Sequence, residues 1–74
     1  MKILIKGTEL IVKKDCCLGD IKSFREVNFE EGEVLYFEEY DSRFTSNKVC
    51  VMMDNNYNRY LCDVNDIDEL FEVV

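Results

Sequence analysis

The segment EVLYFEEY, residues 33–40, most constrains what this chain can fold into. It is dense in aromatic and branched side chains, which favour strands, and it follows Gly32, a turn residue. If Leu35 and Phe37 face a core, the alternate residues share the opposite face, because successive strand side chains point to opposite sides. These outer-face residues are Val34, Tyr36, Glu38 and Tyr40. The segment therefore predicts a half-buried strand with tyrosines on its outer side.

Other short apolar runs extend this β pattern over most of the chain. The runs KILI, ELIVKK, KVCVMM and RYLCDV predict strands, with a bend at Gly7 between the first two. The period changes around residues 20–28, where Asp20 is a suitable helix N-cap. Apolar residues recur there at every third position: Leu18, Ile21, Phe24 and Val27. We therefore expect a short helix over about residues 20–28.

The end of the chain predicts a second, shorter helical element. NDIDELF indicates a single helical turn near residues 65–70, and FEVV indicates a closing strand. Together the elements predict one domain over residues 1–74, of mainly β or α+β class, with five or six antiparallel strands. No apolar run approaches the roughly 18 residues that a membrane span needs. The first residues are interrupted by Lys6 and Glu9, unlike a signal peptide, so we expect a cytoplasmic protein.

The segment MMDNNYNRYLCD, residues 52–63, presents a choice between a calcium loop and a hairpin. The first three ligand positions of an EF-hand loop would be Asp54, Asn56 and Asn58. Such a loop also needs Gly at its sixth position and Glu at its twelfth, where this chain has Arg59 and Asn65. Both flanks predict strands, and Asn tolerates the positive φ of a hairpin bend. We therefore expect a hairpin and no metal.

The four cysteines show no metal-binding or redox spacing. Cys16 and Cys17 are adjacent, and the other two are far downstream, so no C-x-x-C motif exists. The expected hairpin places Cys50 and Cys62 roughly opposite each other, where each would behave as a small buried hydrophobe. Reduced thiols are the expectation, and a bridge between Cys50 and Cys62 is the alternative.

The charge is strongly acidic but unevenly distributed. The chain carries a net charge of -7, and residues 29–74 hold twelve acidic against three basic residues. An acidic surface repels nucleic acids and anionic membranes, because both are bound through Lys and Arg. We therefore expect neither direct nucleic-acid binding nor membrane binding. The expected partner is another protein, for which a basic surface would be complementary.

Catalysis is not indicated by the residue types present. The chain has no histidine, which is the commonest general base and metal ligand. Its three glycines are widely separated, so no phosphate-binding loop is formed. We therefore expect a protein that is not an enzyme and that carries no cofactor.

Residues 29–74 resemble a small SH3-like barrel of the kind common in bacteria and their phages. The order of parts matches: FEEGEVLYFEEYDSRF, two strands joined by a tight bend, a helical turn and a last strand. VLYFEEYD is similar to the aromatic opening of peptide-binding SH3 domains, and YNRYLCDVND lies where their later Tyr-bearing segment would be. The resemblance implies a barrel fold. It does not extend to proline-rich peptides, because those domains stack their ligand on a Trp and this chain has none.

Two functional hypotheses follow. The first is a non-catalytic protein-interaction module, because tyrosine combines rigid apolar area with a polar end. Its candidate binding residues are Tyr36, Glu38, Tyr40, Asp41 and Tyr57. The second is an acidic, phage-type inhibitor that imitates nucleic acid in the basic groove of a nuclease or defence protein. Its clusters would be Glu30, Glu31, Glu33, Glu38, Glu39 and Asp41, and then Asp63, Asp66, Asp68 and Glu69. Exposed strand edges can pair between copies, so we expect a monomer or a weak homodimer.

Overall fold

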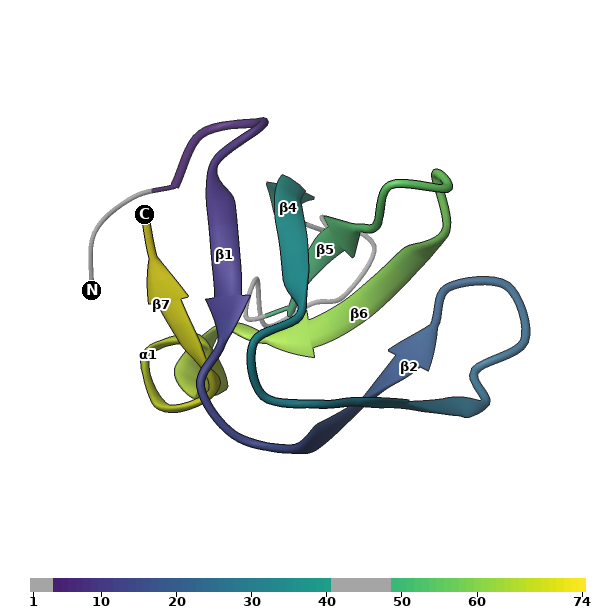
Figure 1. Cartoon of the computed structure of the whole chain (residues 1–74). Coiled ribbons are helices and arrows are strands. Elements are labelled where there is room, and N and C mark those ends of the chain that lie inside the picture. The colour runs from purple at the N-terminus through teal and green to yellow at the C-terminus, as the bar shows by residue number, and fades with distance from the viewer. Residues whose placement is uncertain (1–3, 41–48) are drawn as a thin grey trace.

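In the computed structural model, which describes residues 4–40 and 49–74, the chain forms seven strands and two short helical segments (Figure 1). The strands are β1 (Glu9–Val12), β2 (Cys16–Asp20), β3 (Glu26–Phe29), β4 (Val34–Tyr40), β5 (Val49–Met53), β6 (Arg59–Asp63) and β7 (Phe71–Val73). A 3₁₀ turn, η1 (Val64–Asp66), and the helix α1 (Ile67–Leu70) lie between β6 and β7. The protein is therefore mainly β with one short helix.

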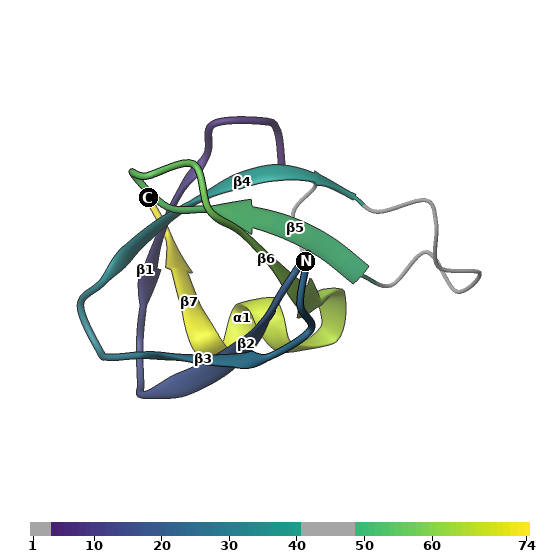
Figure 2. The same ribbon diagram turned by 90° about the vertical axis from the view of Figure 1, so that its right-hand side faces the viewer.

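All seven strands belong to one antiparallel sheet with the order β3-β2-β6-β5-β4-β1-β7. The sheet is strongly curved and wraps around the core, with β3 and β7 at its two edges (Figure 2). Pairing between described residues stops at these edges, so the sheet is not closed and an SH3-like barrel is not confirmed. The strand number exceeds the expected five or six because residues 16–29 contribute two strands.

The core is built from the inward side chains of neighbouring strands and from α1. Leu10 of β1, Leu35 of β4 and Met52 of β5 are almost completely buried. Ile67 of α1 and Phe71 of β7 cover the same cluster, and both are buried to the same degree. Fully burying each such side chain contributes about 1.5–3 kcal/mol, so the one-turn helix is held by its packing rather than by its own hydrogen bonds.

The expected helix over residues 20–28 is wrong, because this segment contains a β-hairpin turn. β2 and β3 pair antiparallel, and Leu18 lies directly opposite Val27. The spacing of these apolar residues therefore reflects the two arms of a hairpin rather than one stripe of a helix. Phe24, which the helix would have buried, is 66% exposed in the turn.

Two interactions explain why this segment is a hairpin. Asp20 caps the turn instead of a helix: its Oδ2 accepts hydrogen bonds from the backbone N–H groups of Lys22 (3.1 Å) and Ser23 (2.9 Å). These hydrogen bonds, together with one from the Ser23 hydroxyl, lower the pKa of Asp20. On the inner face, the ring of Phe29 packs edge-on against that of Tyr60 at 4.9 Å between centroids. A two-turn helix is only marginally stable on its own. Burial of Phe29 in the sheet therefore outweighs the helix propensity of this segment.

The remaining predictions at the two ends of the chain have mixed outcomes. The helical turn near residues 65–70 is confirmed by η1 and α1, and the closing strand is confirmed by β7. The first predicted strand, KILI, extends into residues outside the described part. Its described residues, Leu4 and Ile5, do not form a strand, although Leu4 is buried.

Removing the Ile67 side chain tests whether packing of α1 holds the sheet. The Ile67→Ala variant is expected to lose about 2–5 kcal/mol of unfolding free energy, because it leaves a cavity at a fully buried position. Val74→Ala is the matched control, since Val74 is 70% exposed and should change stability by less than about 0.5 kcal/mol. Urea unfolding measures both values. Equal effects of the two substitutions would contradict this account of the core.

Candidate functional site: an acidic face and an aromatic end

A β-bulge in β4 separates the tyrosines that were expected to share its outer face. Phe37 lies opposite Met52, but the next residue with a partner is Glu39, so Glu38 is the extra residue. The shift places Tyr40 opposite Cys50, on the core side of the strand. Its ring packs against that of Phe37 at 4.9 Å between centroids. The expectation that Tyr36 and Tyr40 share one face of β4 is therefore wrong, although Tyr40 remains 38% exposed.

Tyr40 has a structural role at this position. Its hydroxyl oxygen accepts a hydrogen bond of 3.2 Å from the backbone N–H of Leu4, which ties the start of the described chain to β4. Asp41, another candidate residue, lies outside the described residues. Of the four described candidates, Tyr57 is the most exposed and Tyr40 is partly exposed, whereas Tyr36 and Glu38 are more buried.

Glu38 anchors two cations at the outer end of the sheet. Its Oε1 is 3.2 Å from the Nζ of Lys6 and 3.9 Å from a guanidinium nitrogen of Arg59. The Glu38 side chain is only 10% exposed, and the two cations offset its negative charge. Tyr36 is half-buried on β4 beside this group, opposite Met53. These contacts bring Tyr36 and Glu38 to the end of the sheet that carries the β5–β6 turn.

The Asn-rich segment forms the expected hairpin turn between β5 and β6. The Oδ1 of Asp54 accepts hydrogen bonds from the backbone N–H groups of Asn56 (2.8 Å) and Asn58 (3.0 Å). Its Oδ2 accepts from the Tyr60 hydroxyl (2.9 Å) and from the Asn58 side-chain amide (3.2 Å). Both carboxylate oxygens are thus occupied by the turn itself. The alternating Asp and Asn residues stabilise a hairpin, as the flanking strands predicted.

The same contacts shift the pKa values of the Asp54 carboxyl group and the Tyr60 hydroxyl. Partial burial disfavours the charged Asp54, but the hydrogen bonds from Tyr60 and Asn58 outweigh it and lower the pKa of Asp54. Burial, followed by the hydrogen bond to Asp54, raises the pKa of Tyr60 to about 12. At neutral pH the pair is therefore a carboxylate and a neutral phenol, which is the combination that forms the strongest hydrogen bond here.

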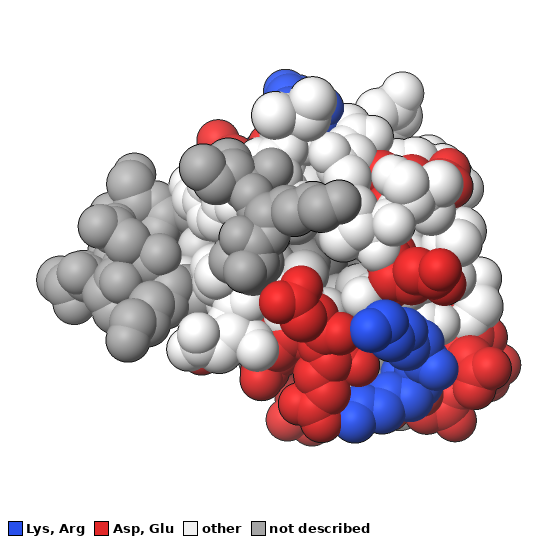
Figure 3. Space-filling model, turned by 90° about the vertical axis from the view of Figure 1, so that its left-hand side faces the viewer, with Lys and Arg blue, Asp and Glu red and all other residues white. Residues whose placement is uncertain are grey.

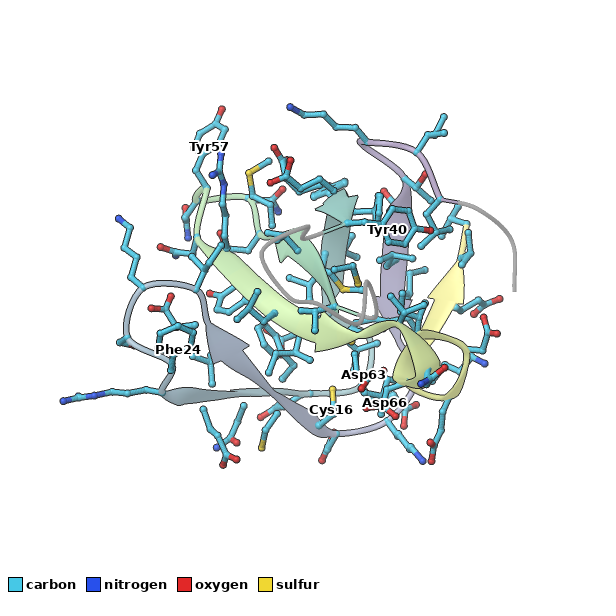
Figure 4. The ribbon with its side chains drawn as sticks, turned by 180° about the vertical axis from the view of Figure 1, so that it is seen from behind. Cys16, Phe24, Tyr40, Tyr57, Asp63 and Asp66 are labelled. Carbon is cyan, nitrogen blue, oxygen red and sulfur yellow. The ribbon has the colours of Figure 1, made fainter. Side chains whose placement is uncertain are left out.

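Tyr57 occupies the backbone position in this turn that was expected for asparagine. Its φ is 65°, in the left-handed region that residues with a Cβ rarely adopt, and its side chain is 80% exposed. Phe24, in the β2–β3 turn, combines the same two features, with a φ of 59°. Figure 4 shows Tyr57 projecting outward from its turn, at the far side of the protein from α1. Strain and exposure at two aromatic residues mark this end as a candidate contact surface.

A small cleft lies beside Tyr57, between the two turns. It has a volume of about 240 Å³ and is lined by Asp20, Ile21, Lys22, Tyr57, Asn58 and Arg59. The backbone N–H of Ile21 donates a hydrogen bond of 3.1 Å to the carbonyl oxygen of Arg59, so the two turns are held together. We call Tyr36, Tyr57 and Arg59 the aromatic end.

The opposite end of the molecule carries the acidic face. Its exposed carboxylates come from the β1–β2 and β3–β4 connections, the end of β6, the two helical segments and β7: Asp15, Glu30, Glu31, Glu33, Asp63, Asp66, Asp68, Glu69 and Glu72. The segment around residues 13–15 joins them. The Nζ of Lys14 is 2.7 Å from the Oε1 of Glu69, and Asp15 accepts a hydrogen bond of 2.9 Å from the backbone N–H of Glu31. Figure 3 shows acidic side chains, in red, gathered around basic ones, in blue, on this side of the molecule.

The acidic residues are thus grouped in space differently from the two clusters expected from the sequence. Glu38 lies at the aromatic end, whereas Glu30, Glu31 and Glu33 join the second cluster. Asp15 and Glu72 also belong to the acidic face but were not predicted. No local pattern in the sequence distinguishes them, because their proximity depends on β1 pairing with β7 and on contact between distant connections.

Lys13 and Lys14 are the basic residues within the acidic face. The Nζ of Lys13 donates a hydrogen bond of 2.7 Å to the backbone carbonyl of Asp68. The contact with Lys14 lowers the pKa of Glu69. Because nine carboxylates surround two lysines, the face keeps a strong negative charge at neutral pH.

The cysteines are free thiols in this structure. Cys50 and Cys62 lie directly opposite each other in the β5–β6 pair, and both are buried, as expected. The hydrogen bond with Cys50 and then burial raise the pKa of Cys62, and burial raises that of Cys16. The thiols of Cys16 and Cys62 therefore stay protonated at neutral pH, which makes them poor nucleophiles.

Metal ligation by the described side chains and membrane spanning by the described helical segments are two further functional properties to consider. In residues 4–40 and 49–74, no three Cys, Asp or Glu side chains are grouped to hold a metal ion. Neither helical segment in this part of the chain is long and apolar enough to cross a membrane. No protein-family model, curated protein or solved structure matches the chain. The acidic face and the aromatic end are thus the two candidate functional surfaces of the described residues.

Replacing Asp54 tests the hydrogen-bond network of the β5–β6 turn. Asp54→Asn is expected to lose about 1.5–3 kcal/mol of unfolding free energy at pH 7, because hydrogen bonds to a charged group are lost. The lowered pKa means that this contribution is present above about pH 4 and disappears as the pH falls through the pKa of the folded state. Chemical unfolding across this pH range measures it. Asn55→Ala, in the same turn, is the control, and an equal loss in both variants would contradict the network.

Replacing Tyr57 tests whether its backbone is strained. Tyr57→Gly is expected to raise the unfolding free energy by about 0.5–1 kcal/mol, because glycine adopts a positive φ without steric cost. Asn55→Gly is the matched control: Asn55 has no positive φ, so glycine there should destabilise the turn. Thermal unfolding distinguishes the two results. A loss of stability in Tyr57→Gly would show that the side chain, despite its exposure, supports the fold.

Proposed function

We propose that this chain is a non-catalytic interaction protein that binds a basic protein partner through its acidic face. The observation that carries the proposal is the gathering of exposed carboxylates from distant segments on one end of the sheet (Figure 3). Such a surface creates a local negative potential that steers a positively charged partner and fixes its orientation. The fold needs none of these side chains in its core, since all are exposed.

A basic protein fits this face better than the other classes of partner. Nucleic acids and anionic membranes carry the same sign of charge as the face and would be repelled. A cation is less suitable, because the described carboxylates are not grouped for metal binding. The acidic face is therefore proposed to meet Lys and Arg side chains.

Imitation of nucleic acid is the more specific form of this proposal. A protein groove that binds phosphates presents Lys and Arg, and carboxylates on a rigid surface can occupy the same positions. The inhibitor expected from the sequence would use Asp63, Asp66, Asp68 and Glu69, with Glu30, Glu31 and Glu33 beside them. Glu38 does not contribute, because it is largely buried between Lys6 and Arg59.

Paired charge variants test the role of the acidic face. The double variant Asp66→Asn/Asp68→Asn is expected to bind the partner at least roughly tenfold more weakly, because it removes two charges from the face. The control, Glu26→Gln/Glu39→Gln, removes two exposed charges elsewhere and should bind as the original chain does. The original chain and the two double variants are each immobilised, and the proteins that they capture from the source cell are identified. The affinity of each captured protein is then measured at low and at high salt. Binding should weaken steeply with salt.

Three outcomes decide between the proposals. Equal binding by the two double variants would contradict a role of the acidic face. Competition between this protein and duplex DNA for the captured partner would support imitation of nucleic acid. Binding without salt dependence, and its loss in Tyr57→Ser, would instead support the aromatic end. That second candidate function is favoured by the exposed and strained Tyr57, because tyrosine is enriched at interaction hot spots.

A further inference from the structure

β3 forms one edge of the sheet and has only one partner among the described strands. It pairs with β2 on one side, and no described strand pairs with its other side (Figure 2). An unpaired edge presents backbone N–H and C=O groups that can pair with another strand. The question is which groups of β3 point outward and what they fit.

The hydrogen-bond pattern of the β2–β3 hairpin identifies the outward groups. The N–H of Asp20 donates to the carbonyl of Arg25 at 2.9 Å, so this pair is of the hydrogen-bonded type. Because the two types of pair alternate along antiparallel strands, Val27 and Phe29 direct their backbone groups toward β2. Glu26 and Asn28 therefore direct theirs outward, and both residues are exposed.

The charges change sign along this edge. The turn before β3 carries Lys22 and Arg25, both exposed. The turn after β3 carries Glu30 and Glu31, also exposed. A second strand that also has basic residues before it and acidic residues after it could pair antiparallel with β3. Its acidic end would then lie beside the basic end of β3, and its basic end beside the acidic end of β3. A second copy of β3 has this distribution.

We propose that two copies of this chain associate edge to edge through β3, antiparallel, around a two-fold axis at Val27. In this register, Glu26 of each copy faces Asn28 of the other, and the two pairs together form about four backbone hydrogen bonds. Arg25 of each copy lies near Glu31 of the other. The interface is isologous, so every favourable contact occurs twice.

Charge selects this register over its neighbours. Centring the axis on Glu26 places two Glu26 carboxylates opposite each other. Centring it on Asn28 places Glu26 opposite Glu30. Like charges directly opposite on paired strands are destabilising, so both alternatives are disfavoured. With the axis at Val27, the carboxylate of Glu26 instead faces the side-chain amide of Asn28, which can donate to it.

The other edge of the sheet is a poorer site for such pairing. β7 contains only three residues. Glu72 within β7 and Asp68 and Glu69 just before it are all acidic, so two copies of this edge would repel each other. The dimer goes beyond the proposed binding of a basic partner, and it leaves the carboxylates around α1 uncovered.

Proline substitution tests the outward N–H of Asn28. Asn28→Pro removes a donor that the fold does not use, so the variant should fold and remain monomeric. Asn28→Ala removes the same side chain, including its contact with Cys17, but keeps the N–H and should still dimerise. Val73→Pro is the control at the β7 edge. Sedimentation is measured from about 10 µM to about 1 mM, where weak dimers form. A monomeric original chain at the highest concentration, or a dimer abolished by Val73→Pro alone, would overturn the proposal.

A charge exchange provides a second test that does not change the backbone. Arg25→Glu and Glu31→Arg should each weaken dimerisation at least roughly tenfold, because each places like charges together across the interface. The chain carrying both substitutions should regain most of the lost affinity, since the pair is re-formed with its signs reversed. If the double variant dimerises no better than the single variants, Arg25 and Glu31 do not meet and the register is wrong. Circular dichroism verifies that all variants are folded.

Discussion

The inward side chains of β4, β5 and β6 meet in register, and the rest of the structure depends on this contact. Phe37 lies opposite Met52, which in turn lies opposite Tyr60, and Cys50 lies opposite Cys62 two pairs further along. These residues are all buried. In a chain of 74 residues little other apolar surface is available, so every remaining element must add to this cluster. β1 does so through β4, β2 and β3 through β6, and α1 by covering the cluster with Ile67.

This arrangement also determines where the charges lie. The strands use their apolar residues for the core, so most carboxylates are left in connections and at strand ends. The connections around residues 13–15, 30–33 and 63–69 lie at one end of the curved sheet, and their charges add. Repulsion among them opposes folding, and Lys13 and Lys14 offset only part of it. A dense acidic surface that opposes folding is the strongest reason to look for a basic partner.

The local features of the fold were predictable, and the non-local ones were not. The hairpin at residues 52–63 was recognised because the hydrogen bonds that form its turn join residues close together in the sequence. The helix over residues 20–28 was a wrong prediction because an apolar residue at every third position fits two arms of a hairpin as well as a helix. The pairing of β2 with β6 and the packing of Phe29 on Tyr60, together with the Asp20 cap of the turn, decide between them. The candidate site shows the same division: Tyr57 was recognised in its turn, but the bulge at Glu38 moved Tyr40 away.

The sequence by itself determined the β class, the short helix near the end, the buried cysteines and the acidic character. Each of these depends on residue type or on contacts within about a dozen positions, which spacing and composition record directly. Tertiary structure alone decided that residues 20–28 form a turn and a strand, that the sheet remains open at β3 and β7, and that separate carboxylates share one face. Those outcomes depend on which distant segments lie side by side. Pairing energies between strands far apart in the chain decide this, and no local pattern encodes them.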